Sequence, residues 1–553
     1  MSTTLIEPSV TVSIGGNTFH ARTDSSCKLD SGAVPYAAGP IVLPFVSDAV
    51  LASLDPRTGA RVTFQAAVNG GTPRTFDLGL RSRTVDHRAK TVRLDLASDE
   101  AILQDHMVLQ DDTTPFNHQA SLRALVGYVL GIASPGAVLA AGPDARSSAK
   151  WDVMNILVNP NVATSIANWV GVGTNAPVRN TGVGFGGAVG YAQAASTQAE
   201  YEVWPEGSTG FGNAPAIRDS TWHTFRAYSR IAAGSATCYA RIIWWDAAGG
   251  IIGGTSGQAI ALTNQWQPLA VTAKSPAGAV RASALLHYSG ASGNTVHADA
   301  AMLCEGRFAP DFYDGSTPDT VDYDFAWTGT ANASNSTRTA LVDAPEPEAF
   351  VWQAGQSAWE FLLPLTSAAG MVLWCDETRT WRLNYPDGRS VPEQINISAI
   401  NSRDGEDILS RDDADVWCTG VVVKYTWEEA GKTRTATRSA GTPGKVARIE
   451  LNSPDPGPGA AAAILARRQG TGRKQDVTAV TIMSTTPGMA AQISLPGAPD
   501  TIGRITAVDF DLGQGFMTVE TAGLVDVNPG DWLALDPAQN WSDTADALDW
   551  KDA

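Results

Sequence analysis

The sequence predicts a mainly β, multidomain protein. Short runs in which apolar and polar residues alternate recur along most of the 553 residues, separated by turn-forming Gly, Pro, Asn and Asp. The 53 Gly and 31 Pro are spread through the chain, and the length corresponds to roughly three to five domains of ordinary size. We expect β-barrel domains at both ends of the chain, a small α+β unit, and a β-sandwich of the jelly-roll type inserted between them.

Residues 1–118 are expected to form the N-terminal β-barrel domain, and residues 119–150 a helix and a connector. The strand, turn and strand pattern of residues 62–78 predicts a hairpin. Apolar residues at helical spacing begin at Leu122 and end before Pro135, which predicts one amphipathic helix.

Residues 151–311 are expected to form the inserted β-sandwich. Strand-like runs at even spacing, each followed by a turn signal, are typical of this fold. The clearest runs are residues 224–230, 238–245, 267–273, 280–288 and 296–303. Residues 312–345 follow as an acidic extension and a linker rich in Asn, Ser and Thr.

The α+β unit is assigned to residues 346–400. A helical pattern at residues 357–369 leads into a hairpin at residues 371–383. Residues 401–553 are then expected to form a C-terminal β-barrel and an acidic tail, interrupted by one helix at residues 460–468.

The composition excludes several classes of protein. The net charge of −18 disfavours binding to nucleic-acid phosphates. The most apolar window, residues 122–141, is broken by Arg123 and Pro135, so no transmembrane segment is expected. Residues 1–8 lack a signal peptide, which predicts synthesis in the cytoplasm. Apolar surroundings predict single core residues rather than disulfides for Cys27, Cys238, Cys304, Cys375 and Cys418.

No catalytic constellation stands out. The glycine pattern of residues 182–187 matches a dinucleotide fingerprint but does not follow a clear strand or open a helix, so we interpret it as a loop. Glycoside hydrolysis needs only two carboxylates, and the best adjacent pairs are Asp322 with Asp324 and Asp412 with Asp413. Both pairs lie in turn-like sequence. We expect no enzyme, and a glycan-degrading enzyme is the alternative.

Tryptophan is concentrated in the inserted domain. Because the side chains of neighbouring strand residues point to opposite faces of the sheet, Trp244 and Trp245 cannot both point into the core. The same alternation on three strands predicts one aromatic and cationic face, suited to a sugar that stacks on rings and hydrogen bonds through its hydroxyls. The predicted carbohydrate-binding residues are Arg226, Tyr228, Tyr239, Arg241, Trp245 and His287. The alternative is that these residues cover the rim of the sandwich or pack on a neighbouring domain.

Two regions resemble phage tail proteins. Residues 357–365, 370–377 and 381–383 resemble the hub proteins at the tail tip of long-tailed bacteriophages. Residues 312–319 with 323–330 are similar to a signature common in minor tail proteins of phages that infect actinobacteria.

Residues 155–305 resemble a carbohydrate-binding module of the jelly-roll type. The resemblance implies a structural calcium where the opening segment Asn159-Pro160-Asn161 meets the last strand at Asp299. This chain departs from the family pattern, because Val162 and Ala163 stand where an aromatic residue and a Glu are usual. No other cofactor is implied.

Together the resemblances imply a baseplate hub located at the distal end of the virion tail. Residues 1–150 and 346–545 would build the hub as a homotrimer, in contact with the distal tail protein, the tape measure protein and other tail-tip proteins. The inserted sandwich would attach to host cell-envelope polysaccharide. A further alternative makes the sandwich only a spacer or a docking site for another tail protein.

Overall fold

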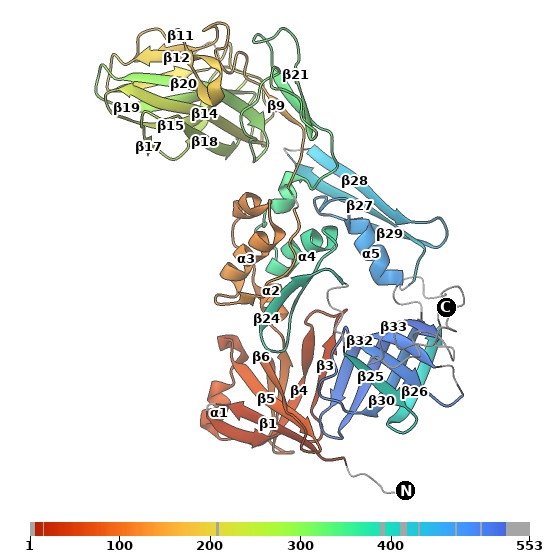
Figure 1. The fold of residues 1–553 in the computed structure, drawn as a ribbon. Helices are drawn as coiled ribbons and strands as arrows, with labels where there is room; N and C mark the ends of the chain where they lie inside the picture. The colour runs from red at the N-terminus through yellow and green to blue at the C-terminus, as the bar shows by residue number, and fades with distance from the viewer. Residues whose placement is uncertain are drawn as a thin grey trace, which may run out of the picture.

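The computed structural model describes residues 6–14, 16–146, 148–205, 210–386, 393–409, 417–429, 432–469, 473–497 and 500–526. The molecule is elongated, with a broad base at one end, a narrower middle and a β-sandwich at the other end (Figure 1). Within the described ranges no helix is long and apolar enough to cross a membrane.

The base is one sheet built from both ends of the chain. Its N-terminal strands are β1 (Pro8–Ile14), β2 (Asn17–His20), β3 (Ser26–Asp30), β4 (Ala37–Pro44), β5 (Arg61–Val68), β6 (Arg74–Asp86) and β7 (Thr91–Ala97). Its C-terminal strands are β25 (Gln394–Ser398), β26 (Ser402–Leu409), β30 (Arg473–Val480), β31 (Ala490–Ser494), β32 (Thr501–Asp511) and β33 (Phe516–Asp526). The hydrogen-bonded path runs β2-β1-β5-β6-β7-β4-β3-β32-β33-β30-β26, with β31 paired to β32 and β25 to β31.

The antiparallel pairing of β3 with β32 joins the two halves, from Ser26 opposite Asp511 to Asp30 opposite Ala507. The predicted multidomain β fold is confirmed, but the prediction of two separate β-barrels is wrong. Among the described strands no barrel closes, and the two ends of the chain share one sheet. Alternation predicts which side of a strand is buried and does not identify the strand beside it.

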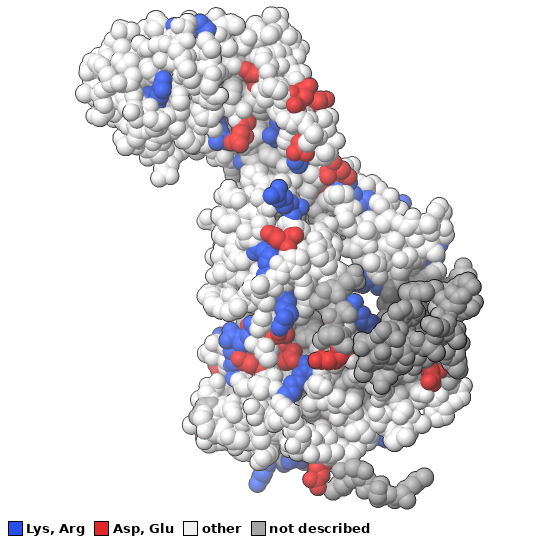
Figure 2. All heavy atoms as spheres, in the orientation of Figure 1, with Lys and Arg blue, Asp and Glu red and all other residues white. Residues whose placement is uncertain are grey.

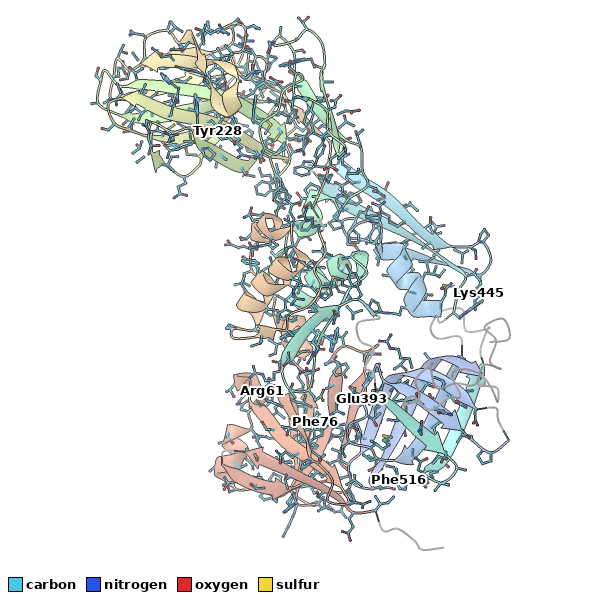
Figure 3. The ribbon with its side chains drawn as sticks, viewed as in Figure 1. Arg61, Phe76, Tyr228, Glu393, Lys445 and Phe516 are labelled. Carbon is cyan, nitrogen blue, oxygen red and sulfur yellow. The ribbon has the colours of Figure 1, made fainter. Side chains whose placement is uncertain are left out.

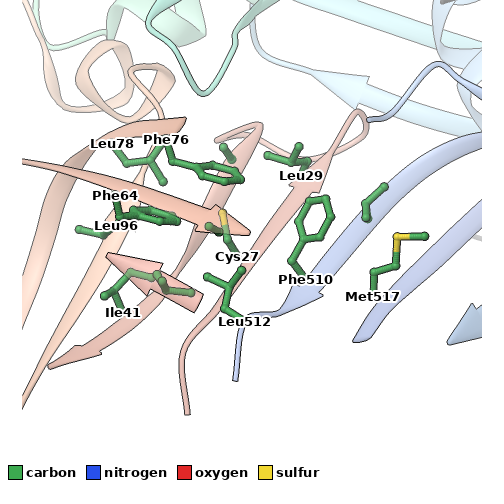
Figure 4. Packing of buried hydrophobic residues seen from close by; sticks show 14 of the residues in the cluster. Cys27, Leu29, Ile41, Phe64, Phe76, Leu78, Leu96, Phe510, Leu512 and Met517 are labelled. Carbon is green, nitrogen blue, oxygen red and sulfur yellow. The ribbon is translucent and has the colours of Figure 1, made fainter. Parts of the chain in front are cut away.

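Side chains from both halves form one hydrophobic core (Figure 4). Phe64 stacks on Phe76 with ring centroids 4.6 Å apart, and Phe76 meets Phe510 of β32 edge to face at 6.5 Å. Cys27 lies opposite Phe510 across the junction. It is buried and free, as are Cys238, Cys304, Cys375 and Cys418, so the prediction of core cysteines is confirmed.

The middle of the molecule packs helices against a small sheet. The helices are α2 (Glu100–Asp105), α3 (Leu122–Ala133) and α4 (Ala358–Ala368), and the strands are β8 (Val138–Leu139), β23 (Val372–Cys375) and β24 (Thr380–Asn384). α3 begins where Ser121 Oγ accepts a hydrogen bond from the Ala124 N–H at 3.0 Å, and it ends before Ser134. Both helices and the hairpin predicted for this region are confirmed.

α4 begins with a capping box. Ser357 Oγ accepts a hydrogen bond from the Glu360 N–H at 3.2 Å, and Glu360 Oε2 accepts one from the Ser357 N–H at 2.9 Å. Ser357→Ala is therefore expected to lower the free energy of unfolding by about 1 kcal/mol, measured by chemical denaturation. Ser367→Ala, near the other end of the helix, is the control. Equal effects of the two substitutions would contradict a stabilising role for the box.

A second small sheet lies beside the middle. Its strands are β27 (Gly420–Glu429), β28 (Lys432–Gly441) and β29 (Val446–Leu451), and α5 (Ala460–Gln469) packs on it. The helix predicted at residues 460–468 is confirmed. The remaining short helices are α1 (Asp48–Ser53), η1 (Pro56–Thr58), η2 (Thr114–His118), η3 (Phe185–Gly187) and η4 (Pro347–Phe350). The predicted acidic tail lies within residues 527–553, which are outside the described residues.

The inserted domain is a β-sandwich. One sheet has the order β10-β13-β19-β15-β16, with β17 beside β15, and the other has the order β11-β12-β20-β14-β18. The first sheet contains β10 (Val170–Val172), β13 (Glu200–Trp204), β15 (Ala236–Trp245), β16 (Ile251–Ser256), β17 (Ile260–Ala261) and β19 (Arg281–Gly290). The second contains β11 (Val178–Val183), β12 (Val189–Ala195), β14 (Trp222–Ala233), β18 (Gln267–Lys274) and β20 (Thr295–Glu305). The core between them includes Phe225, Leu303, Trp244 and Leu286.

Residues 312–345, predicted to be an extension and a linker, contain a folded sheet. Its strands are β21 (Tyr323–Trp327), β22 (Ser336–Ala340) and β9 (Val153–Asn155), so the two ends of the insertion pair with each other. The guanidinium of Arg338 is buried and lies 4.2 Å from the ring centroid of Tyr323. The linker interpretation is wrong, because residues 336–340 form β22. This strand was not predicted because its buried residues, Ser336 and Arg338, are polar and give no apolar alternation.

Candidate functional site

The predicted carbohydrate-binding residues lie on two different sheets. Arg226 and Tyr228 are on β14, in the five-stranded sheet, where Figure 3 labels Tyr228. The other four, Tyr239, Arg241, Trp245 and His287, are on β15 and β19 of the six-stranded sheet. The prediction of one continuous face is therefore wrong. Alternation predicts that a side chain points away from the core, but it does not show to which sheet its strand belongs. The outer faces of the two sheets of a sandwich point in opposite directions.

The outer surface of the six-stranded sheet contains a polar cluster, which we call the His287 face: Glu200, Glu202, Tyr239, Arg241 and His287. The strand register brings these residues together, because His287 is opposite Tyr239 on β15 and Glu202 on β13. His287 Nε2 lies 2.8 Å from Glu200 Oε2, and Nδ1 lies 3.2 Å from Glu202 Oε1. The imidazole also stacks on the Tyr239 ring, with centroids 4.7 Å apart.

The electrostatics of the His287 face favour a charged imidazole. Hydrogen bonding to Glu202, and then to Glu200, raises the pKa of His287. The same contact with His287 lowers the pKa of Glu202. For Glu200 the pKa is lowered first by the hydrogen bond from Ser289 Oγ, at 2.7 Å, and then by His287. The cluster therefore places the imidazole between two carboxylates, and these side chains offer a polar ligand both hydrogen-bond donors and acceptors.

Arg241 supplies an unused donor at the same face. Its Nε atom is buried and has no hydrogen-bond partner within the part of the chain that the structure describes. Its charge lies close enough to Glu202 to lower the pKa of that carboxyl. A buried donor without a partner is costly, so Arg241 Nε is a polar group that the described fold leaves unsatisfied beside Glu202.

Trp245 is not available on this surface. Its side chain is only 7% exposed, and its indole N–H donates to Ser283 Oγ at 2.8 Å. Phe211, Trp204 and Ile243 pack beside it. The segment after β13 covers this end of the sheet, a tertiary contact that strand alternation cannot reveal. Trp245 therefore belongs to a second, smaller hydrophobic core of this domain and is not a binding residue on this surface.

Arg226 and Tyr228 are occupied by contacts with other residues of the inserted domain. The Tyr228 ring is 5% exposed and lies under Phe185, with centroids 3.5 Å apart. The guanidinium of Arg226 lies over Tyr228 and forms an ion pair with Asp311 at 3.1 Å. Both contacts are made within residues 151–311 and not with a neighbouring domain, and they engage the Tyr228 ring and the Arg226 guanidinium.

The residues around Asp299 do not fit a calcium ion. Calcium takes six to eight oxygen ligands, among them carboxylates free to coordinate. Both Asp299 oxygens accept backbone N–H groups, from Phe185 and Ala300, each at 2.8 Å. The neighbouring Asp314 binds the Asn161 side-chain amide and the Ser316 N–H. Burial raises the pKa of Asp299 to about 7, which also disfavours the ionised ligand. No group of three acidic, His or Cys residues in the described ranges could hold a metal.

The carboxylate pairs considered for hydrolysis do not form a described site. Asp322 forms an ion pair with Lys150, and Asp324 is exposed on β21. Asp412 and Asp413 lie outside the described residues. Residues 182–187 end β11 and continue into η3, so the glycine pattern is a turn as predicted.

A row of polar and aromatic side chains around Arg230, on the five-stranded sheet, was not predicted from the sequence. Its members, which we call the Arg230 row, are Gln193, His297, Arg230 and Trp266. Gln193 is opposite His297, and His297 is opposite Arg230. The Arg230 guanidinium lies 4.6 Å from the Trp266 ring centroid. Arg226, Tyr228 and Arg230 alternate along β14 on the same side of the strand. Extending the alternation by two residues beyond Tyr228 would have predicted Arg230 as an outward residue.

No family model matches the sequence, and no curated protein sequence matches it. Over 93% of its length the chain is similar to the tail protein from Neisseria meningitidis MC58, with 9% identity, 96% of that chain covered and a TM-score of 0.38. It is also similar over 93% of its length to the 43 kDa tail protein of prophage MuSo2 from Shewanella oneidensis, with 10% identity, 98% of that chain covered and a TM-score of 0.39.

A third similarity covers 27% of the chain. It is to the C-terminal family 22 carbohydrate binding module of Clostridium thermocellum Xyn10B, with 14% identity, 94% of that module covered and a TM-score of 0.21. Several larger solved proteins are matched over 27–30% of this chain, and the chain spans only 21–30% of their length. With TM-scores below 0.5, these similarities carry no argument about the function of this chain.

Proposed function

We propose that this chain is a structural, non-enzymatic protein of a phage virion: a tail-tip hub that assembles as a homotrimer at the distal end of the tail. Its base would contact the distal tail protein and the tape measure protein. The observation that carries the proposal is the division of the chain, in which both ends build one base and the sandwich projects at the far end of the molecule (Figure 1). The resemblance of residues 357–365 to tail-tip hub proteins, and of residues 312–319 with 323–330 to minor tail proteins, supports the same assignment.

Assembly is tested with purified chain and purified virions. We expect the chain to form a defined ring of three copies, and an antibody against the sandwich to label the distal end of the tail in electron micrographs. A monodisperse monomer that is absent from purified particles would rule the hub assignment out.

We further propose that the sandwich attaches the virion to host envelope polysaccharide through the His287 face. The arrangement that supports this is the fixed array of Glu200, Glu202, His287 and Arg241 beside the Tyr239 ring. Carboxylate oxygens accept hydrogen bonds from sugar hydroxyls, while imidazolium and guanidinium groups donate to them. An aromatic ring beside such groups is suited to the apolar face of a sugar.

His287→Gln is expected to weaken binding to neutral polysaccharide from the host envelope by about tenfold or more, because hydrogen bonds to charged groups contribute about 1.5–3 kcal/mol. Tyr239→Ala tests the ring. Titration calorimetry with the full chain measures both. The control is Lys274→Gln, an exposed residue on the opposite sheet. Unchanged affinity in both test variants, with unchanged unfolding midpoints, would exclude this face.

The same polysaccharide distinguishes the remaining functions. A glycan-degrading enzyme would release reducing ends from it, whereas the proposed structural protein would bind it without cleavage. A spacer or a docking module for another tail protein would neither bind nor cleave it.

A further inference from the structure

The two outer surfaces of the sandwich differ in charge. The strands of the five-stranded sheet carry Arg179, Arg226, Arg230 and Lys274 against Asp299 and Glu305, whereas those of the other sheet carry Arg241 and Arg281 against Glu200 and Glu202. Most charged side chains on the view in Figure 2 gather over the middle and the base, and the sandwich shows few. An anionic ligand would therefore meet less repulsion on the five-stranded sheet than elsewhere on a chain of net charge −18.

Arg230 is held in place by aromatic rings. Its guanidinium lies 4.6 Å from the Trp266 ring centroid and 5.3 Å from that of Tyr191, which meets Trp266 edge to face. Arg230 Nε donates to His297 Nδ1 at 3.1 Å. Rings on which a guanidinium stacks reduce its freedom before binding, which lowers the entropic cost of binding a ligand.

The charge of Arg230 is not neutralised by these contacts. Burial, and then Arg230 itself, lowers the pKa of His297 to about 4, so this partner is a neutral acceptor. The only acidic residue nearby on the sheet, Asp299, is 1% exposed and uses both oxygens for backbone N–H groups. No carboxylate in the described ranges forms an ion pair with Arg230, although other arginines of the sandwich, such as Arg226, have one.

The rest of the Arg230 row matches an extended ligand. Gln193, His297 and Arg230 follow one another across β12, β20 and β14, and Trp266 directly precedes β18, whose Gln267 is opposite Ser229. With strands about 4.8 Å apart, the row is roughly 15 Å long. Gln193, Arg230 and Trp266 are each partly exposed, so an amide, a guanidinium and an indole ring are open to solvent along it.

We propose that the Arg230 row is a second glycan site, which binds an acidic polysaccharide. Arg230 would pair with the carboxylate or phosphate of the glycan through its two terminal nitrogens, Trp266 would stack on a sugar ring, and Gln193 would hydrogen bond to hydroxyls. This site is on the opposite sheet from the His287 face and does not depend on it.

The test is titration of the full chain with a short oligogalacturonate, its fully methyl-esterified form, and poly(glycerol phosphate). Oligogalacturonate or poly(glycerol phosphate) should bind, and the tighter of the two identifies the acidic group. The neutral ester should bind at least about tenfold more weakly than its acid, because charge-assisted hydrogen bonds are roughly twice as strong as neutral ones. Binding of neither anionic probe, or equal binding of acid and ester, would overturn the proposal.

Variants then locate the site. Arg230→Gln is expected to reduce affinity for the bound anionic probe by about tenfold or more, and Arg230→Lys by less, because lysine keeps the charge without the planar fork. Trp266→Ala should weaken binding as well. Arg57→Gln, at an exposed arginine of the base that belongs to neither face of the sandwich, is the matched control and should leave it unchanged. Wild-type affinity in Arg230→Gln, or loss only in His287→Gln, would contradict the assignment. If Arg230→Gln does not fold, Trp266→Ala and Arg230→Lys still decide it.

Discussion

Replacing Arg74 with alanine is expected to lower the free energy of unfolding by about 3–5 kcal/mol. Arg74 Nη2 lies 2.5 Å from Glu377 Oε1, and Nη1 donates to the carbonyls of Met483 and Thr485 at 2.9 and 2.6 Å. The side chains of Arg74 and Glu377 are only 14% and 12% exposed. The substitution would therefore leave a buried carboxylate and two carbonyls without their partner, and chemical denaturation measures the loss.

Two controls separate this burial effect from a general loss of charge. Arg57→Ala removes an arginine that also pairs with a carboxylate, Asp55, but is 88% exposed, and it should have no measurable effect. The double substitution Arg74→Met with Glu377→Leu removes both charges and should recover most of the stability. A double variant as unstable as Arg74→Ala would show that the ion pair itself, and not the unpaired Glu377, determines the loss.

The second large effect depends on pH. Glu348 on η4 is 8% exposed and lies 3.5 Å from Arg307, and burial raises its pKa to about 7. Because the folded pKa exceeds the ordinary value of 4.5, the folded state binds the proton more tightly. The contribution to stability is therefore fully present below about pH 4.5 and is lost as the pH rises through 7.

Glu348→Gln removes this titration and should stabilise the protein by about 1–3 kcal/mol at pH 8, with almost no effect at pH 4.5. Chemical denaturation of both proteins at each pH measures the difference. Burial lowers the pKa of His223 and of His297 to about 4, but these groups are common to both proteins and cancel. Glu450→Gln, at an exposed residue, is the control. A pH-independent offset for Glu348→Gln would contradict the argument.

Local features of the fold could be predicted from the sequence. Ser357 and Glu360, which cap α4, are only three residues apart, and the apolar spacing that predicts α3 also lies within one short segment. Such local patterns predict helix positions. The pairing of β3 with β32 joins segments at opposite ends of the chain, and no local pattern encodes it. β22 escaped prediction because Arg338, buried against aromatic rings, replaces the apolar residue that alternation would require.

The site was predicted only in part for the same reason. The positions of Tyr239 and His287 on the outside of their strands followed from alternation, and the register confirms that they are neighbours. Their carboxylate partners come from β13, which lay outside the predicted strands. Trp245 was misassigned because Phe211, which lies between β13 and β14 in the sequence, packs against it. Whether the assigned residues bind a glycan stays a prediction.

The pairing of β3 with β32 also has a consequence for synthesis. About 470 residues separate Asp30 from Thr501, and at 5–20 residues per second a ribosome needs roughly 25–95 s to make them. During that time the edge of β3 that later meets β32 has unpaired N–H and C=O groups, which favours aggregation. All strands of the sandwich precede residue 306, so the sandwich can fold before β32 of the base has been synthesised. The inserted domain thus lengthens the period for which a nascent, unfinished base must remain soluble.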